Sequence, residues 1–208
     1  MAAPKYLRLR REAWGFIVGS ALFIVGAVPG YLQALGSTVD NATFFIGSVF
    51  FTVAAYIQLN LSGRRPPRAA TNRPDRFDWW AAAIQFAGTL FFNLSTAAAL
   101  TASLGGASRT GWRPDAYGSV CFLVAGILAV VATTGRDALW DPKARTWRST
   151  WLNLLGSVAF GVAAIGAFPV AATGQELMAG WATGGTIVGG VCFLAAAALA
   201  RPGPARLA

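Results

Sequence analysis

Five polar side chains inside apolar stretches of the chain could bind a polar solute or an ion. Gln85, Thr89, Asn93 and Thr96 follow one another at steps of four, four and three residues, which places them on one narrow arc of a helix. Asn153 occupies the matching place in a later stretch. Amides and hydroxyls within a membrane either line a pathway or hydrogen-bond to neighbouring helices, at about 0.6 kcal/mol per contact. We prefer the second interpretation.

The acidic residues fall in predicted loops or at helix edges, where general acid–base chemistry is not expected. No spacing places two carboxyl groups on one helical face in a cleft, as acid–base catalysis requires. Glu12, Asp75 and Asp78 are the candidates for an enzyme acting on lipid head groups, which would require them to share a pocket. The chain has no Gly-x-Ser-x-Gly elbow, phosphate loop or metal signature. We therefore expect a protein without enzymatic activity.

Metal and haem ligands are scarce, because the chain has no histidine and two cysteines. A zinc, iron–sulfur or haem site built by the protein has almost nothing to ligate with, and no cofactor is expected.

Cys121 and Cys192 occupy matching places in two apolar stretches, and a disulfide requires those helices to touch at that depth. We favour buried free thiols, which behave as small apolar side chains.

The composition is that of an all-helical membrane protein. Apolar residues make up 55% of the 208 residues, charged residues make up 12%, and the mean hydropathy is +0.53. About 20 apolar residues span the hydrocarbon of a bilayer as a helix. Six stretches qualify without the two-residue alternation of a barrel strand: Ala13 to Leu35, Thr43 to Ser62, Trp79 to Leu104, Ala116 to Gly135, Thr150 to Ala172 and Gly180 to Ala200. Together they predict a single membrane domain of six transmembrane helices.

A short sequence word recurs at a fixed step and predicts three repeated units. The words that begin at Gly47, Gly118 and Gly189 share the pattern Gly-[Ser/Gly]-Val-[Phe/Cys]-Phe and are 71 residues apart. A weaker Gly-[Ser/Thr]-x-x-Phe word begins at Gly19, Gly88 and Gly156. We expect helical hairpins over about 10–62, 76–135 and 148–200, arranged around a pseudo-threefold axis.

The small residues of these words are predicted to pack helices together, since glycine in a membrane helix allows backbones to approach closely. They are Gly19, Ser20, Gly47, Ser48, Gly88, Gly118, Ser119, Gly156, Ser157, Gly189 and Gly190. The phenylalanines beside them would fill the remaining gaps.

The first hairpin resembles a known family. The segments 10–14, 19–26 and 44–51 look like the YrhK-like domain of bacterial membrane proteins, a two-helix unit with a Gly-Ser pair in each helix. The resemblance covers residues 10–62, is recognisable in 116–135 and is weaker elsewhere, where Gln85 to Ser95 and Gly189-Gly190 depart from it. It implies the inner membrane of a bacterium and brings no catalytic motif.

The distribution of basic residues predicts the orientation. Fifteen of the 17 flank the spans on one side, and only Arg109 and Arg113 lie on the other. Because basic residues accumulate on the cytoplasmic side, both termini are expected inside. The basic residues flank spans, so the net charge of +9 does not indicate nucleic-acid binding. We expect the first apolar stretch to be retained, since it is long for a signal peptide.

Two functions remain open at this level. The leading hypothesis is a non-enzymatic scaffold or assembly partner that acts through helix packing. The alternative is a small channel or carrier for a polar solute or ion, with Gln85, Asn93 and Asn153 along its path. The expected partners are the lipid bilayer and either another membrane protein or further copies of this chain.

Overall fold

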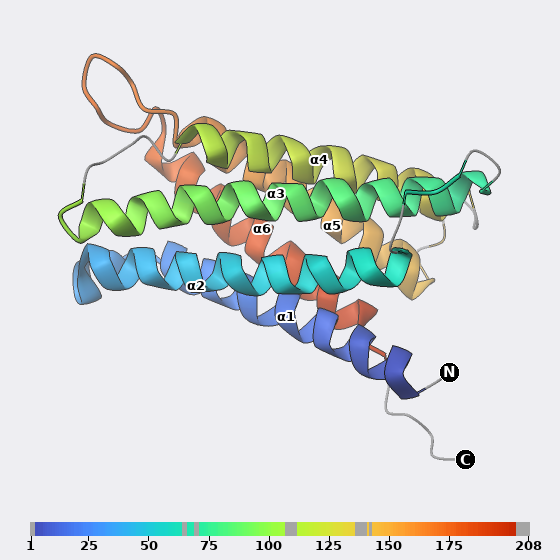
Figure 1. Cartoon of the computed structure of the whole chain (residues 1–208). Coiled ribbons are helices and arrows are strands. Elements are labelled where there is room, and N and C mark those ends of the chain that lie inside the picture. The colour runs from blue at the N-terminus through green and yellow to red at the C-terminus, as the bar shows by residue number, and fades with distance from the viewer. Residues whose placement is uncertain are drawn as a thin grey trace.

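The described part of the chain folds into six helices and contains no β-strand (Figure 1). The computed structural model describes residues 3–63, 66–68, 71–106, 112–135, 141 and 143–202. The helices are α1 (Ala3–Ala27), α2 (Tyr31–Ser62), α3 (Arg73–Ser103), α4 (Trp112–Thr134), α5 (Arg145–Gly166) and α6 (Ala179–Ala200). The prediction of six helices is confirmed.

Five of the six, α2 to α6, are long and apolar enough to cross a membrane. The first helix begins with a charged segment, Lys5 to Glu12. Its uncharged part, from Ala13 to Ala27, is about 22 Å long at 1.5 Å per residue. That length is less than the roughly 30 Å of bilayer hydrocarbon, so the uncharged part of α1 alone is too short to cross it.

The helices form a closed ring. In the described part of the chain, the backbone of each helix contacts those of its neighbours in sequence, α6 also contacts α1, and no two backbones make contact across the ring. Figure 1 shows the start of α1 and the end of α6 at the same end of the bundle. The ring therefore encloses one central axis, on which the inner faces of all six helices converge.

Six phenylalanines, one from each helix, fill the middle of that axis. They are Phe23, Phe51, Phe92, Phe122, Phe160 and Phe193, each at most 5% exposed. Their ring centroids lie 5.0 to 6.4 Å apart, within the range of favourable aromatic contacts. Each is the last residue of the Gly-[Ser/Thr/Gly]-x-x-Phe word of its helix. We call this cluster the phenylalanine plug.

The first glycine of each word lies against its counterpart in the same hairpin. A methyl group on Gly19 would lie 2.9 Å from the carbonyl oxygen of Gly47, and one on Gly47 would lie 2.9 Å from the ring of Phe23. The same reciprocal contact joins Gly88 with Gly118 and Gly156 with Gly189. Because glycine and phenylalanine are four residues apart, they share one helical face. Each plug ring therefore covers the glycine of the paired helix.

In the words of α2, α4 and α6, the second residue lies at an interface between hairpins. Between α2 and α3, Ser48 Oγ and Thr96 Oγ1 are 3.0 Å apart and share a hydrogen bond. Between α4 and α5, Ser119 Oγ donates to the carbonyl oxygen of Phe160 at 3.4 Å. Between α6 and α1, a methyl group on Gly190 would lie 2.7 Å from Ile24 Cγ1. This close contact explains why glycine replaces serine at that position.

Several predicted boundaries are wrong. The first connection is a tight turn at Val28 to Gly30, whereas the apolar stretches predicted a loop between Leu35 and Thr43. Gly30 has a φ of 94°, a left-handed conformation that glycine adopts readily. The helix that follows continues through Gly36, which has a φ of 81° and produces a kink.

Other ends also differ from the prediction. Helix α3 begins at Arg73, before the predicted Trp79, because the side chain of Asn72 caps it by accepting from the Asp75 N–H at 2.9 Å. Helix α5 ends at Gly166, before the predicted Ala172, and a β-bridge joins the following Pro169 to Glu176.

The two cysteines are free and half-buried, and they lie on helices whose backbones are not in contact. Cys121 is in α4 and Cys192 is in α6, and these helices are separated by α5 in the ring. A disulfide between them requires Cα atoms within about 7 Å, so this bridge is excluded in the folded monomer.

Candidate functional site

Two cavities open on the axis, one on each side of the phenylalanine plug. The near cavity lies at the end of the bundle where the N-terminal segment of α1 and the C-terminal end of α6 meet, and its volume is about 410 Å³. The far cavity lies at the opposite end, and its volume is about 550 Å³. Phe51, Phe122 and Phe193 border the near cavity, whereas Phe23, Phe92 and Phe160 border the far one. Even-numbered and odd-numbered helices thus present their rings to opposite sides.

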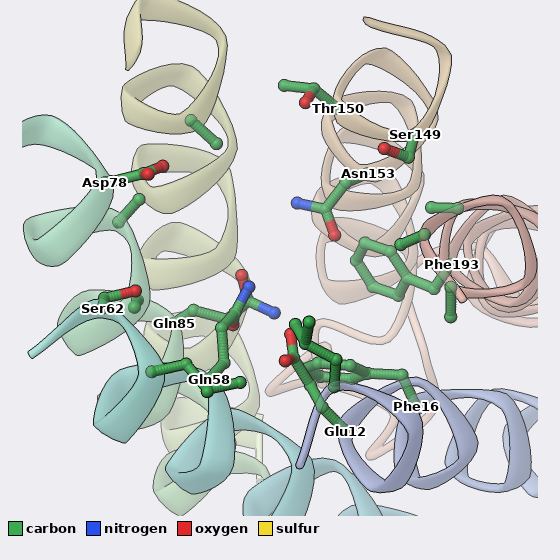
Figure 2. Close-up of a pocket in the computed structure, with 18 of the residues that line it drawn as sticks. Glu12, Phe16, Gln58, Ser62, Asp78, Gln85, Ser149, Thr150, Asn153 and Phe193 are labelled. Carbon is green, nitrogen blue, oxygen red and sulfur yellow. The ribbon is translucent and has the colours of Figure 1, made fainter. Parts of the chain in front are cut away.

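Polar side chains from five helices line the near cavity, and α6 adds small apolar residues. The polar and charged lining residues are Lys5, Glu12, Gln58, Ser62, Asp78, Gln85, Thr133, Ser149, Thr150 and Asn153. Figure 2 shows Glu12 from α1, Gln58 from α2 and Gln85 from α3 pointing toward one another, with Asn153 of α5 directed into the same space. Hydrogen-bond donors and acceptors therefore converge in the centre of a bundle whose outer face is apolar.

One acceptor of the near cavity lacks a partner. Gln58 Oε1 is buried and makes no hydrogen bond. A buried acceptor without a donor costs about 1–3 kcal/mol, so the unpaired amide oxygen favours a water, a cation or an N–H donor in the cavity.

The carboxyl group of Glu12 is perturbed by its surroundings. Glu12 lies one residue before the uncharged part of α1, and burial raises its pKa from 4.5 to about 7. Near neutral pH the group is therefore divided between protonated and ionised forms, and it could both accept and release a proton.

The far cavity contains a different set of groups. Its polar and charged lining residues are Gln33, Asp40, Asn41, Ser95, Thr96, Asp115, Glu176, Thr183 and Thr186. Asp40 Oδ1 is buried there without a hydrogen-bond partner. All three charged side chains in this lining are acidic.

The polar residues predicted from the sequence are divided between these places. Gln85 and Asn153 line the near cavity, and Thr96 lines the far one. Thr89 is fully buried and donates to the carbonyl oxygen of Phe86 at 2.7 Å. Asn93 Nδ2 donates to Thr52 Oγ1 at 2.9 Å across the α2–α3 interface. The stripe on α3 therefore reaches both cavities, but its middle part is used in helix packing.

Sequence reasoning missed that Glu12, Gln58 and Asp78 line the same cavity. Glu12 and Asp78 are two of the three carboxyls considered for head-group chemistry, while Asp75 borders a separate cavity of about 400 Å³ beside it, which Asp78 also lines. The spacing of these residues from the plug phenylalanines could have indicated the shared cavity. Gln58 lies seven residues after the plug residue of its helix, and Asp78 lies seven residues before Gln85, which itself lies seven before Phe92. Steps of seven keep side chains on one helical face.

No protein-family model, curated protein or solved structure matches this chain.

Proposed function

We propose that this integral membrane protein is a small channel or carrier for a polar solute or ion, in a conformation closed by the phenylalanine plug. The observation that supports this proposal is the pair of polar cavities on one axis, at opposite ends of a closed helical ring. Hydrophobic constrictions gate membrane pathways by excluding water. Six buried aromatic rings between two polar cavities are such a constriction.

The distribution of side chains supports the same proposal. Large apolar residues such as Val53, Leu94 and Val188 are exposed on the outside of the ring, where lipid would contact them. Amides, hydroxyls and carboxyls are directed inward, to the cavities. Polar groups that face the interior of a membrane bundle are typical of solute and ion pathways.

We further propose that the three hairpins are related by a pseudo-threefold axis that runs through the plug. The reciprocal glycine contact in each hairpin and the alternation of the plug rings between the cavities support this arrangement. Membership of the YrhK-like family, as the sequence resemblance implies, is part of the same proposal.

The proposed orientation places the near cavity on the cytoplasmic side of a bacterial inner membrane. Most basic residues that the structure describes, including Lys5, Arg8, Arg148 and Arg201, belong to the helix ends and connections of the near end, whereas Arg113 begins α4 at the other. This asymmetry is typical of cytoplasmic segments.

Removal of the plug tests the proposed function. Phe92 and Phe122 contact each other with centroids 5.0 Å apart, and they border opposite cavities. Truncation of both to alanine should connect the cavities and raise solute flux in liposomes above that of the unmodified protein. The matched control is Phe91→Ala, since Phe91 lies beside Phe92 on α3 but packs against Tyr117 away from the plug. A folded double variant with unchanged flux of every solute tested would refute the pathway.

A scaffold remains the second candidate, because the plug fills the middle of the axis in this conformation. All six rings are at most 5% exposed, as in the core of a rigid protein. A scaffold predicts that the double variant loses stability without conducting. The same flux experiment measures whether it conducts.

A further inference from the structure

The charge of the two cavities is opposite to that of the whole protein. The chain has 17 basic and eight acidic residues, with a formal charge of +9. Among the described residues that line the cavities, however, five carry carboxyl groups and one, Lys5, is basic. Random placement of the charged residues would give a mostly basic lining. The axis thus gathers acidic groups, while the described basic residues other than Lys5 lie outside both cavity linings.

The far cavity receives one carboxyl group from each hairpin. Asp40 is on α2, Asp115 is in the first turn of α4, and Glu176 precedes α6. Arg113, the basic residue described at this end, is exposed and does not line the cavity. A cleft with low-dielectric walls and charges of one sign concentrates counter-ions. In their ionised forms these groups would attract cations into the cavity and repel anions.

The unpaired atoms in both cavities have the same chemical character. Gln58 Oε1 in the near cavity and Asp40 Oδ1 in the far cavity are buried hydrogen-bond acceptors without a donor. Lone-pair oxygens of this kind are satisfied by a cation or by a group that carries N–H or O–H. An anion would face the same oxygens unfavourably.

The geometry argues against a tightly ligated metal ion. No group of three or more histidine, cysteine, aspartate or glutamate residues is close enough to hold a metal within the described part of the chain. A cation in these cavities would keep most of its water, which suits an ion of low charge density. Divalent sites instead require several protein oxygens at coordination distance.

We propose that the solute of this pathway is a small, hydrated monovalent cation, selected by the three acidic side chains of the far cavity. This inference rests on the proposed function, because it names the chemical class of solute that the axis would carry.

The test measures three solutes in the same preparation. The full chain and the Phe92→Ala/Phe122→Ala variant are reconstituted in liposomes, and the entry of thallium(I), iodide and glycerol is followed optically. These probes are a monovalent cation, a monovalent anion and a neutral polar molecule.

Entry of thallium well above that of iodide and glycerol is the expected result. Entry of iodide or glycerol at a rate equal to or above that of thallium would overturn the cation proposal, while the proposed pathway would remain. Entry of none of the three, from protein shown to be folded, would overturn the proposed function and the cation proposal together.

Charge removal then tests the role of the far cavity. The triple variant Asp40→Asn, Asp115→Asn, Glu176→Gln should lower the initial thallium rate by about tenfold, the lower end of the effect of focused charge on ion entry. The matched control is Asp141→Asn, because Asp141 lies outside both cavities and accepts from the backbone N–H of Lys143. An unchanged thallium rate in the folded triple variant would overturn the assignment of selectivity to these carboxylates.

Discussion

A methyl group added to Gly189 tests whether the glycine contacts hold each hairpin together. The added carbon would lie 2.5 and 2.7 Å from two ring atoms of Phe160, and 3.1 Å from the carbonyl oxygen of Gly156. Favourable carbon–carbon contacts are about 3.5–4.0 Å long. Phe160 cannot move away easily, because its ring is within 5.4 to 5.8 Å of those of Phe23, Phe92 and Phe193. Gly189→Ala should therefore strain both α5 and the plug.

The expected loss of folding stability follows from a comparison of two glycines in one helix. Gly184 is also in α6, and a methyl group on it would meet nothing within 4 Å. Both substitutions gain the same helix propensity, up to about 1 kcal/mol, so this gain cancels between them. Overpacking costs about 1–3 kcal/mol. Gly189→Ala should be less stable than Gly184→Ala by that amount, about 5- to 150-fold in the folding equilibrium.

Equilibrium unfolding in mixed micelles, followed by tryptophan fluorescence, measures the difference. Far-UV circular dichroism checks that both variants begin with the same helix content. Equal free energies of unfolding for the two variants would refute the reasoning, because the short contacts would then have no energetic consequence.

Two further predictions concern the polar groups of the bundle. A double-mutant cycle of Asn93→Leu with Thr52→Val should give a coupling energy of about 0.6 kcal/mol, since the two side chains share one interhelical hydrogen bond; unfolding of the four proteins in micelles measures it, and a coupling near zero would contradict that bond. Burial raises the pKa of Glu12 to about 7 in the folded state, so the folded protein binds more protons than the unfolded chain between about pH 4.5 and 7. Stability from this group is thus fully present below about pH 4.5 and is lost as pH rises to about 7. Glu12→Gln should flatten that part of the unfolding profile, and an unchanged profile would assign the slope to another group.

The number and type of the helices follow from the sequence, but the first connection does not. Residues 36–42 contain Gly36, Asp40 and Asn41, a composition typical of a loop outside the membrane. In the structure this segment is helical, and Asp40 and Asn41 line the far cavity. Polar residues that face a cavity on the axis cannot be distinguished from loop residues by composition alone.

The components of the site were visible in the sequence, but their convergence was not. Gln85 and Asn153 stand out because they interrupt apolar stretches, whereas Glu12 and Gln58 lie near the ends of predicted spans, where polar residues are common. Only closure of the ring brings the ends of α1, α2, α3 and α5 to one cavity. Contacts between distant segments depend on tertiary packing, which helical periodicity does not specify.

The closed ring has a consequence for the order of the hairpins along the chain. The first and last helices, α1 and α6, pack against each other as neighbouring helices do elsewhere in the ring. The ring of contacts is therefore compatible with a chain that starts at another helix. A circular permutant that joins the segment after Ala200 to the start of α1 by a flexible linker, and begins instead at Asn72 before α3, should preserve all six interfaces. The three hairpins would then be interchangeable in order, and the connections would be tethers that keep them in one molecule.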